Sequence, residues 1–86
     1  MRIDLLLNKL CLTKTRSIAK NACDKNLAWL NGKHAKASNE VKAGDHIRLD
    51  LYGFTHEFEI TEIPAGNVAK KDVTVYYKLL NKTPIG

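Results

Sequence analysis

Two runs of alternating apolar and polar residues constrain the fold of this chain more than any other feature. The first run, residues 46–51, has apolar residues at every second position: Ile47, Leu49 and Leu51. The second run, residues 54–60, has the same period in Phe54, His56, Phe58 and Ile60. Because successive side chains of a strand point to opposite faces, each run predicts a half-buried strand. The Tyr52-Gly53 pair between them predicts a turn, and so an antiparallel pair.

Two short stripes at helical spacing precede these strands and predict the layer that covers them. The first stripe, at i, i+3, i+4 and i+7, is Ile3, Leu6, Leu7 and Leu10. The second stripe is Thr15, Ile18, Ala19 and Ala22. Thr13 and Thr15 are the candidate N-caps of the second helix, which we expect to end near Lys25-Asn26.

Turn signals divide the rest of the chain. Leu27 to Leu30 runs into Asn31-Gly32, a strong signal for a tight hairpin turn. Gly44 predicts a second turn within residues 41–45, and residues 64–67 (Pro-Ala-Gly-Asn) are expected to close the sheet. Residues 70–80 fit either a helical stripe or a strand, and we expect a short helix. The predicted fold class is α+β: two short helices packed on a small twisted, mainly antiparallel sheet, followed by a C-terminal extension.

The positive charge of the chain is concentrated in its first half. Residues 1–42 hold nine Lys or Arg and three acids, a net of +6, whereas residues 43–86 hold five bases and six acids, a net of −1. Eighty-six residues make a single domain. The polarity predicts that one face of this domain meets a polyanion.

Several classes of protein are excluded by what the sequence lacks. No apolar run approaches the roughly 20 residues of a membrane span, and the start does not resemble a signal peptide, so we expect a cytoplasmic protein. The spacing of Cys11 and Cys23 favours reduced, packed thiols over a zinc site or a disulfide. No metalloprotease, nucleophile-elbow, P-loop or dinucleotide-binding motif is present, so no enzyme, metal or cofactor is expected.

The basic residues gather around the predicted helices and the first hairpin. Lys14, Arg16 and Lys20 lie at the start of the second helix, and Lys33 and Lys36 follow the Asn31-Gly32 turn. If Thr15 caps this helix, its first-turn amides and positive dipole end attract phosphate. Arg16 is unfavourable there for the helix itself, which suggests that an anion is expected. The alternative is a solvated basic face that keeps the protein soluble.

These residues also carry a family resemblance. The segments 1–4 (Met-Arg-Ile-Asp), 14–17 (Lys-Thr-Arg-Ser) with Ala19, 30–32 (Leu-Asn-Gly) with Ala35, Lys36 and Ser38, and 41–45 (Val-Lys-Ala-Gly-Asp) resemble the S-four, or alpha-L, RNA-binding domain. The resemblance covers about residues 1–52, and residues 53–86 add a strand and the C-terminal extension. The overall length and residues 70–72 (Lys-Lys-Asp) resemble the stand-alone bacterial branch. That branch includes the fifteen-kilodalton heat-shock protein and a small RNA-binding factor of ribosome-associated quality control.

The resemblance implies a non-catalytic RNA-binding protein. Its partners would be structured ribosomal RNA of large subunits that carry stalled peptidyl-tRNA, with tRNA and a quality-control protein as further candidates, and the chain would be a monomer off the ribosome. Carried over by motif, the expected RNA contacts are Arg2, Lys14, Thr15, Arg16, Lys20, Asn31, Lys33 and Lys36. Asp4 is expected to organise Arg2 or the helix start, because a carboxylate would repel phosphate.

Three residues depart from the family pattern. Leu5 replaces the usual lysine and removes one contact, and Asn26 replaces a glycine before the hairpin. Trp29 stands where the family is usually polar. It either packs on a second apolar patch, such as one under the C-terminal tail, or is an exposed aromatic that stacks on a base or a protein partner.

Two other function classes stay open. The chain could be the RNA-targeting subunit of a separate RNA-modifying or tRNA enzyme, which predicts that it copurifies with that enzyme. It could instead be a protein-binding module that uses Trp29, Tyr76 and Tyr77, which predicts binding insensitive to salt and nuclease.

Overall fold

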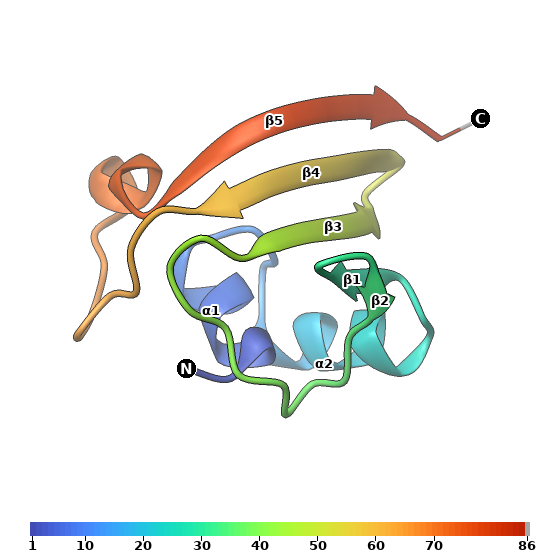
Figure 1. The fold of residues 1–86 in the computed structure, drawn as a ribbon, viewed down its shortest axis with the longest axis horizontal. Helices are drawn as coiled ribbons and strands as arrows, with labels where there is room; N and C mark the ends of the chain where they lie inside the picture. The colour runs from blue at the N-terminus through green and yellow to red at the C-terminus, as the bar shows by residue number, and fades with distance from the viewer. Residues whose placement is uncertain (86) are drawn as a thin grey trace.

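The computed structural model of the chain describes residues 1–85 and consists of helices packed on one side of a five-stranded sheet (Figure 1). Two α-helices come first, α1 (Ile3–Lys9) and α2 (Arg16–Asp24). Strands β1 (Ala28–Leu30), β2 (Lys33–His34), β3 (His46–Leu51) and β4 (Phe54–Ile60) follow. The 3-10 helix η1 (Lys70–Val75) precedes the last strand, β5 (Tyr77–Pro84). This architecture confirms the predicted α+β class.

The sheet has the order β2-β1-β3-β4-β5, and each neighbouring pair is antiparallel. The predicted turns are where the sequence placed them. Asn31 and Gly32 have φ of 51° and 85°, the conformation that a two-residue hairpin turn requires. Tyr52 and Gly53, with φ of 56° and 78°, connect β3 to β4, and Gly44 has φ of 93°. The strands predicted over residues 46–51 and 54–60 are confirmed as β3 and β4.

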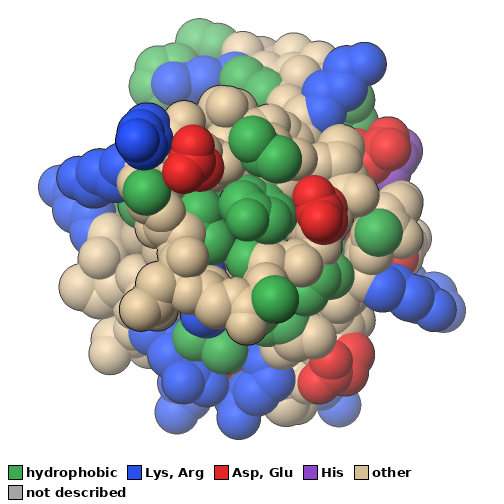
Figure 2. Space-filling model, turned by 90° about the vertical axis from the view of Figure 1, so that its left-hand side faces the viewer, with side chains coloured by type: hydrophobic (Ala, Val, Ile, Leu, Met, Phe, Trp, Pro, Cys, Tyr) green, Lys and Arg blue, Asp and Glu red, His purple; other side chains and the backbone are tan. Residues whose placement is uncertain are grey.

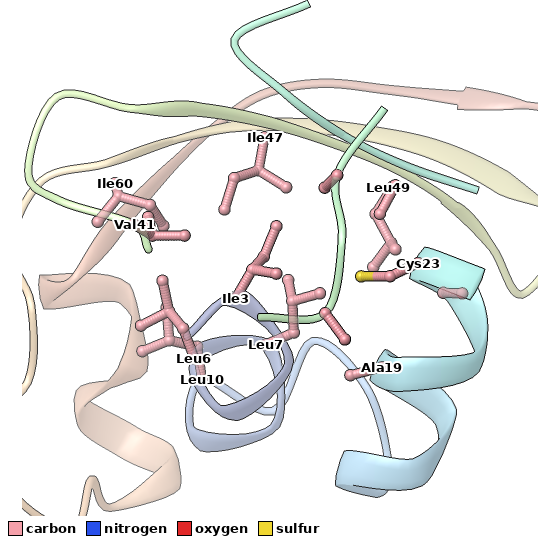
Figure 3. Packing of buried hydrophobic residues seen from close by; sticks show 14 of the residues in the cluster. Ile3, Leu6, Leu7, Leu10, Ala19, Cys23, Val41, Ile47, Leu49 and Ile60 are labelled. Atoms are coloured by element: carbon pink, nitrogen blue, oxygen red, sulfur yellow. The ribbon is translucent and has the colours of Figure 1, made fainter. Parts of the chain in front are cut away.

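The core lies between the two α-helices and the inner face of the sheet (Figure 3). All four residues of the first predicted stripe are buried, and Ala19 and Ala22 of the second let α2 approach α1 closely. The sheet contributes the inward residues of its middle strands: Ala28, Ile47, Leu49, Phe58 and Ile60. Lys25 is the C-cap of α2, and the next residue, Asn26, has φ of 59°, as the predicted helix end requires.

The C-terminal segment differs from the expectation in two ways. The helix predicted over residues 70–80 exists only as η1 and ends at Val75, and the strand β5 begins two residues later, at Tyr77. Residues 64–67 therefore do not close the sheet, because β5 pairs with β4 beyond them. The physical reason is the free edge of β4, whose ladder groups need partners. Tyr77 also packs edge-on against the buried Phe58 at 5.6 Å, which favours a strand at this point.

The two cysteines are unpaired and lie in different environments. Cys23 is buried in the core, and this burial raises the pKa of its thiol to about 11. Cys11 is exposed and has φ of 58°, so the expectation of two packed thiols is wrong for it. Within residues 1–85, no helix is long and apolar enough to cross a membrane.

Candidate nucleic-acid interface

The buried carboxylate of Asp4 joins two arginines that are far apart in sequence. Arg2 Nε lies 3.3 Å from Asp4 Oδ1, and Arg16 Nε lies 3.4 Å from Oδ2. The amide of Leu5 also donates to Oδ1 at 2.8 Å. The Asp4 side chain is 3% exposed, whereas those of Arg2 and Arg16 are 46% and 49% exposed. Asp4 thus orients two guanidinium groups whose other donors face solvent, which confirms its expected structural role toward Arg2.

The start of α2 has the predicted cap. The Thr15 hydroxyl accepts a hydrogen bond from the Ile18 amide at 3.1 Å, and Thr13 is buried with its hydroxyl donating to the Thr15 carbonyl. The structure gives a different reason for the position of Arg16, however. The anion that Arg16 meets is Asp4, so its position in the first helical turn is explained without an external ligand. Two guanidinium groups on one carboxylate still leave a net positive charge.

The loop before β3 extends this basic surface. Its backbone lies against the start of α1. The backbones of Arg2 and Glu40 form an isolated antiparallel β-bridge, and the Ile3 amide donates to the Asn39 carbonyl. Asn39 in turn accepts from the Lys36 amide at 2.8 Å through its side chain. A shallow hollow of about 500 Å³ follows, lined by residues that include Asn31, Lys33, Lys36 and Glu40. The structure therefore brings Lys33 and Lys36 to the side of the molecule that carries Arg2.

Lys and Arg side chains gather along the lower edge of the face in Figure 2. In Figure 1 the same lower side holds α1, α2 and the loop before β3. Lys20 is exposed on α2, one helical turn after Arg16. This arrangement places a cluster of cations on the helical side of the sheet.

Asn31 has a structural role that the sequence did not reveal. Its side-chain amide donates to Asp45 Oδ1 at 3.1 Å, and its oxygen accepts from the His46 amide at 2.9 Å. Asp45, itself buried, also accepts from the Lys42 amide. Asn31 therefore joins the hairpin turn to the start of β3, and its amide group is already engaged within the protein.

Lys14 is separated from the other predicted contacts. Its amide donates to the Tyr52 hydroxyl at 3.1 Å, and its ammonium lies 5.8 Å from the centre of the Tyr52 ring. Lys14 therefore faces the β3–β4 turn, whereas Arg16 faces Asp4.

Trp29 packs against side chains of neighbouring strands. It is half-buried on the sheet face opposite the helices, and its neighbours come from the two strands that flank β1. The Arg48 guanidinium carbon lies 4.5 Å from the centre of its ring, and the His34 ring centre lies 5.1 Å away. Arg48 is also bonded to Asp50. Trp29 is thus held by side chains of the sheet, and it lines a hollow on the outer sheet face together with Leu80 of β5.

The described residues hold no cluster of side chains that could bind a metal ion. Among residues 1–85, no group of three His, Cys, Asp or Glu side chains could hold a metal ion. Three contacts were not predicted from the sequence: the second partner of Asp4, the bridge made by Asn31, and the Trp29–Arg48 pair. The last of these had a signal, because Trp29 and Arg48 both occupy outward positions of adjacent strands.

Known proteins resemble this chain in sequence and in fold. No protein-family model matches the chain. A relative from Helicobacter pylori (strain ATCC 700392 / 26695), the "RQC P-site tRNA stabilizing factor", is 47% identical over 77 residues, which are 88% of this chain and 92% of the relative. The protein of the same name from Bacillus subtilis is 29% identical and spans 100% of this chain and 99% of its own.

Two solved structures share the fold. The trimeric structure of Vibrio cholerae Heat Shock Protein 15 has a TM-score of 0.86 at 26% identity, covering 93% of this chain and 81% of that one. The solution structure of the hypothetical protein HP1423 has a TM-score of 0.80 at 44% identity and covers 94% and 98%. These likenesses confirm the resemblance to the stand-alone branch of the S-four RNA-binding family. The chain belongs to the family of RQC P-site tRNA stabilizing factors.

Proposed function

We propose that this chain is a non-catalytic RNA-binding protein of ribosome-associated quality control. It binds large ribosomal subunits that carry a stalled peptidyl-tRNA, and it stabilises the tRNA in the P site by contacting that tRNA and nearby ribosomal RNA. The proposal treats residues 1–86 as one RNA-binding domain that acts in the cytoplasm and is a monomer off the ribosome. The names of its relatives support the ribosomal setting.

One observation carries the proposal: Arg2 and Arg16 are held side by side on Asp4 with half of each side chain exposed. A guanidinium presents several donors in one plane, so a single carboxylate does not use them all. The remaining donors suit a phosphate, whose oxygens accept paired hydrogen bonds. Arg16 lies in the first turn of α2 and Arg2 is the N-cap of α1, where the helix dipoles add positive potential.

Recognition rests on backbone phosphates and RNA shape. The exposed cations at this surface are lysines and arginines at helix starts and turns, groups that meet phosphates and do not read base sequence. Asn31 supports the surface through its bond to Asp45, and Thr15 supports it by capping α2. We assign phosphate contacts to Arg2, Arg16, Lys20, Lys33 and Lys36.

The function is tested by sedimentation through sucrose gradients. Purified chain is mixed with large subunits that carry peptidyl-tRNA, and separately with empty large subunits. We expect the chain to sediment with the tRNA-bearing subunits and to be released by raised salt. Sedimentation with neither kind of subunit, together with copurification of an RNA-modifying or tRNA enzyme, would favour the targeting-subunit alternative.

A further inference from the structure

We infer that a groove between the α1–α2 connection and strands β4 and β5 binds an unpaired nucleotide of the RNA. The groove has a volume of about 380 Å³, and Lys14 and Lys82 are among its lining residues. It is separate from the Arg2–Asp4–Arg16 cluster, and the inference rests on the proposed RNA-binding function.

The groove exists because β5 extends the sheet beyond the helices. Figure 1 shows β5 at the edge of the sheet farthest from α1 and α2. The inward side chains of β5 therefore have no helix above them, and Leu79 is 51% exposed. Beneath them, Phe58 and Leu49 are fully buried and form an apolar floor. An apolar floor with an open side suits a flat ring better than it suits a phosphate chain.

Aromatic rings and cations lie close together in and beside the groove. Tyr52 is 47% exposed with Lys14 beside its ring, and its hydroxyl is fixed by the Lys14 amide. Tyr77 stands on the other side, held edge-on against Phe58. Lys82 lies 4.5 Å from the centre of the Phe54 ring. Proteins that bind single-stranded RNA combine these two features, because bases stack on aromatic rings and cations meet the adjoining phosphates.

The charge of the groove separates it from the other hollows. Its lining residues within the described chain include two lysines and one histidine but no carboxylate. The hollow beside Lys33 includes Glu40, and the hollow on the outer sheet face beside Trp29 includes Glu57. Each of those two hollows thus includes a carboxylate, which the groove lacks. Along the chain, Lys14 of the groove directly precedes Thr15, the cap of α2, and Arg16 of the proposed RNA surface.

The test measures the affinity of the full chain for two RNA probes, decauridylate and a blunt RNA duplex. Lys82→Gln should weaken decauridylate binding about threefold to tenfold and leave duplex binding within about twofold. Lys78→Gln is the matched control, because Lys78 is exposed on the same strand but outside the groove, and it should leave both affinities within about twofold. Thermal melts establish that each variant is folded.

A second pair of variants tests stacking. Tyr52→Leu removes the ring and should weaken decauridylate binding at least fivefold, whereas Tyr52→Phe keeps the ring and should bind within about twofold of the original. Ring protons of Tyr52 and Tyr77 should shift in NMR spectra when decauridylate is added.

The outcomes separate this inference from the proposed function. If Arg16→Gln weakens both probes while Lys82→Gln and Tyr52→Leu change neither, the groove assignment is overturned and the RNA-binding function stands. If neither probe binds at low salt, both are overturned. If polyglutamate shifts the same ring protons and competes as well as decauridylate, the groove selects charge and not bases, and the assignment is also overturned.

Discussion

Arg16 Nε lies 3.4 Å from Asp4 Oδ2, so the first turn of α2 is tied to the first turn of α1 through a carboxylate that is almost completely buried. Arg2 contacts both oxygens of the same carboxylate, through Nε to Oδ1 and through Nη2 to Oδ2. The contact links folding to function, because the groups that hold the two helices together are the groups that we assign to RNA. It also leads to a prediction that runs against simple charge counting.

Asp4→Asn should weaken RNA binding even though it raises the net charge of the chain from +5 to +6. The reason is that the neutral amide no longer orients both guanidinium groups. Loss of the charged contacts should also lower the free energy of unfolding by about 1–3 kcal/mol. The matched control is Asp24→Asn, which makes the same charge change at an exposed residue at the end of α2 and should leave affinity unchanged or slightly higher. Tighter binding by Asp4→Asn would show that Asp4 only repels phosphate.

Gly32→Val should lower the free energy of unfolding by about 1–3 kcal/mol. Gly32 has φ of 85°, and a Cβ placed there would meet nothing within 4 Å, so the cost comes from the backbone conformation and not from a clash. RNA binding should also fall, because the turn positions Asn31 against Asp45. Urea titration measures the stability change. Lys33→Ala is the comparison: it should keep stability within about 0.5 kcal/mol and still reduce affinity. Normal binding by that variant would limit the hairpin to a scaffold.

RNA should leave the environment of Trp29 nearly unchanged. Because Arg48 and His34 already pack against its ring from the two flanking strands, we expect these side chains, and not a base, to remain its neighbours when RNA binds. Trp29 is the single tryptophan of the chain, so its fluorescence reports this site directly. Emission and acrylamide quenching are expected to be the same with and without RNA. Strong quenching on binding, lost in Arg48→Ala, would restore the stacking role of Trp29.

Stability should fall as the pH rises from about 9 to about 11. Burial raises the pKa of the Cys23 thiol from 9.0 to about 11, so in this window the thiol ionises in the unfolded chain but stays protonated in the folded one. Below pH 9 neither state is ionised, and the effect is absent. This loss of stability is measured by comparing the unfolding midpoints of the unsubstituted chain and of Cys23→Ala across this pH range. The contribution of Cys23 would be refuted if both proteins lost stability equally.

Sequence patterns predicted most of this fold because local signals agreed with the tertiary structure. The stripe at Ile3, Leu6 and Leu7 and the Thr15 cap predicted the helices. The Asn31-Gly32 pair predicted the hairpin, and both of its residues have the positive φ that the turn requires. The strand β5 was missed because Val73, Tyr76 and Leu80 also fit a helical period. Its formation depends on the edge of β4, a partner that periodicity does not show.

The candidate site was predictable in composition but not in geometry. The charge imbalance and the motif residues identified Arg2, Arg16 and the lysines, yet the pairing of Arg16 with Asp4 requires two helices to pack first. Lys14 shows the same limit. Its sequence position placed it with Arg16, whereas the Tyr52 hydroxyl holds it at the β3–β4 turn.

The salt dependence of RNA binding reports how many phosphates are contacted. If about four to six cations meet phosphates, the plot of log K against log salt concentration should have a slope of roughly −3 to −5. Arg2→Gln or Arg16→Gln should each make that slope shallower by about one. A slope near zero would favour the protein-binding alternative.

The central claim is that the arginine pair on Asp4 binds RNA on the large subunit, and affinity for subunits that carry a P-site peptidyl-tRNA tests it most directly. Arg16→Gln and Lys78→Gln each remove one positive charge, but Lys78 lies on β5, at the opposite end of the sheet from β2. With both variants folded by thermal melting, Arg16→Gln should lose at least tenfold in affinity and Lys78→Gln less than about twofold. Equal losses would show that bulk charge alone drives binding and would contradict the account.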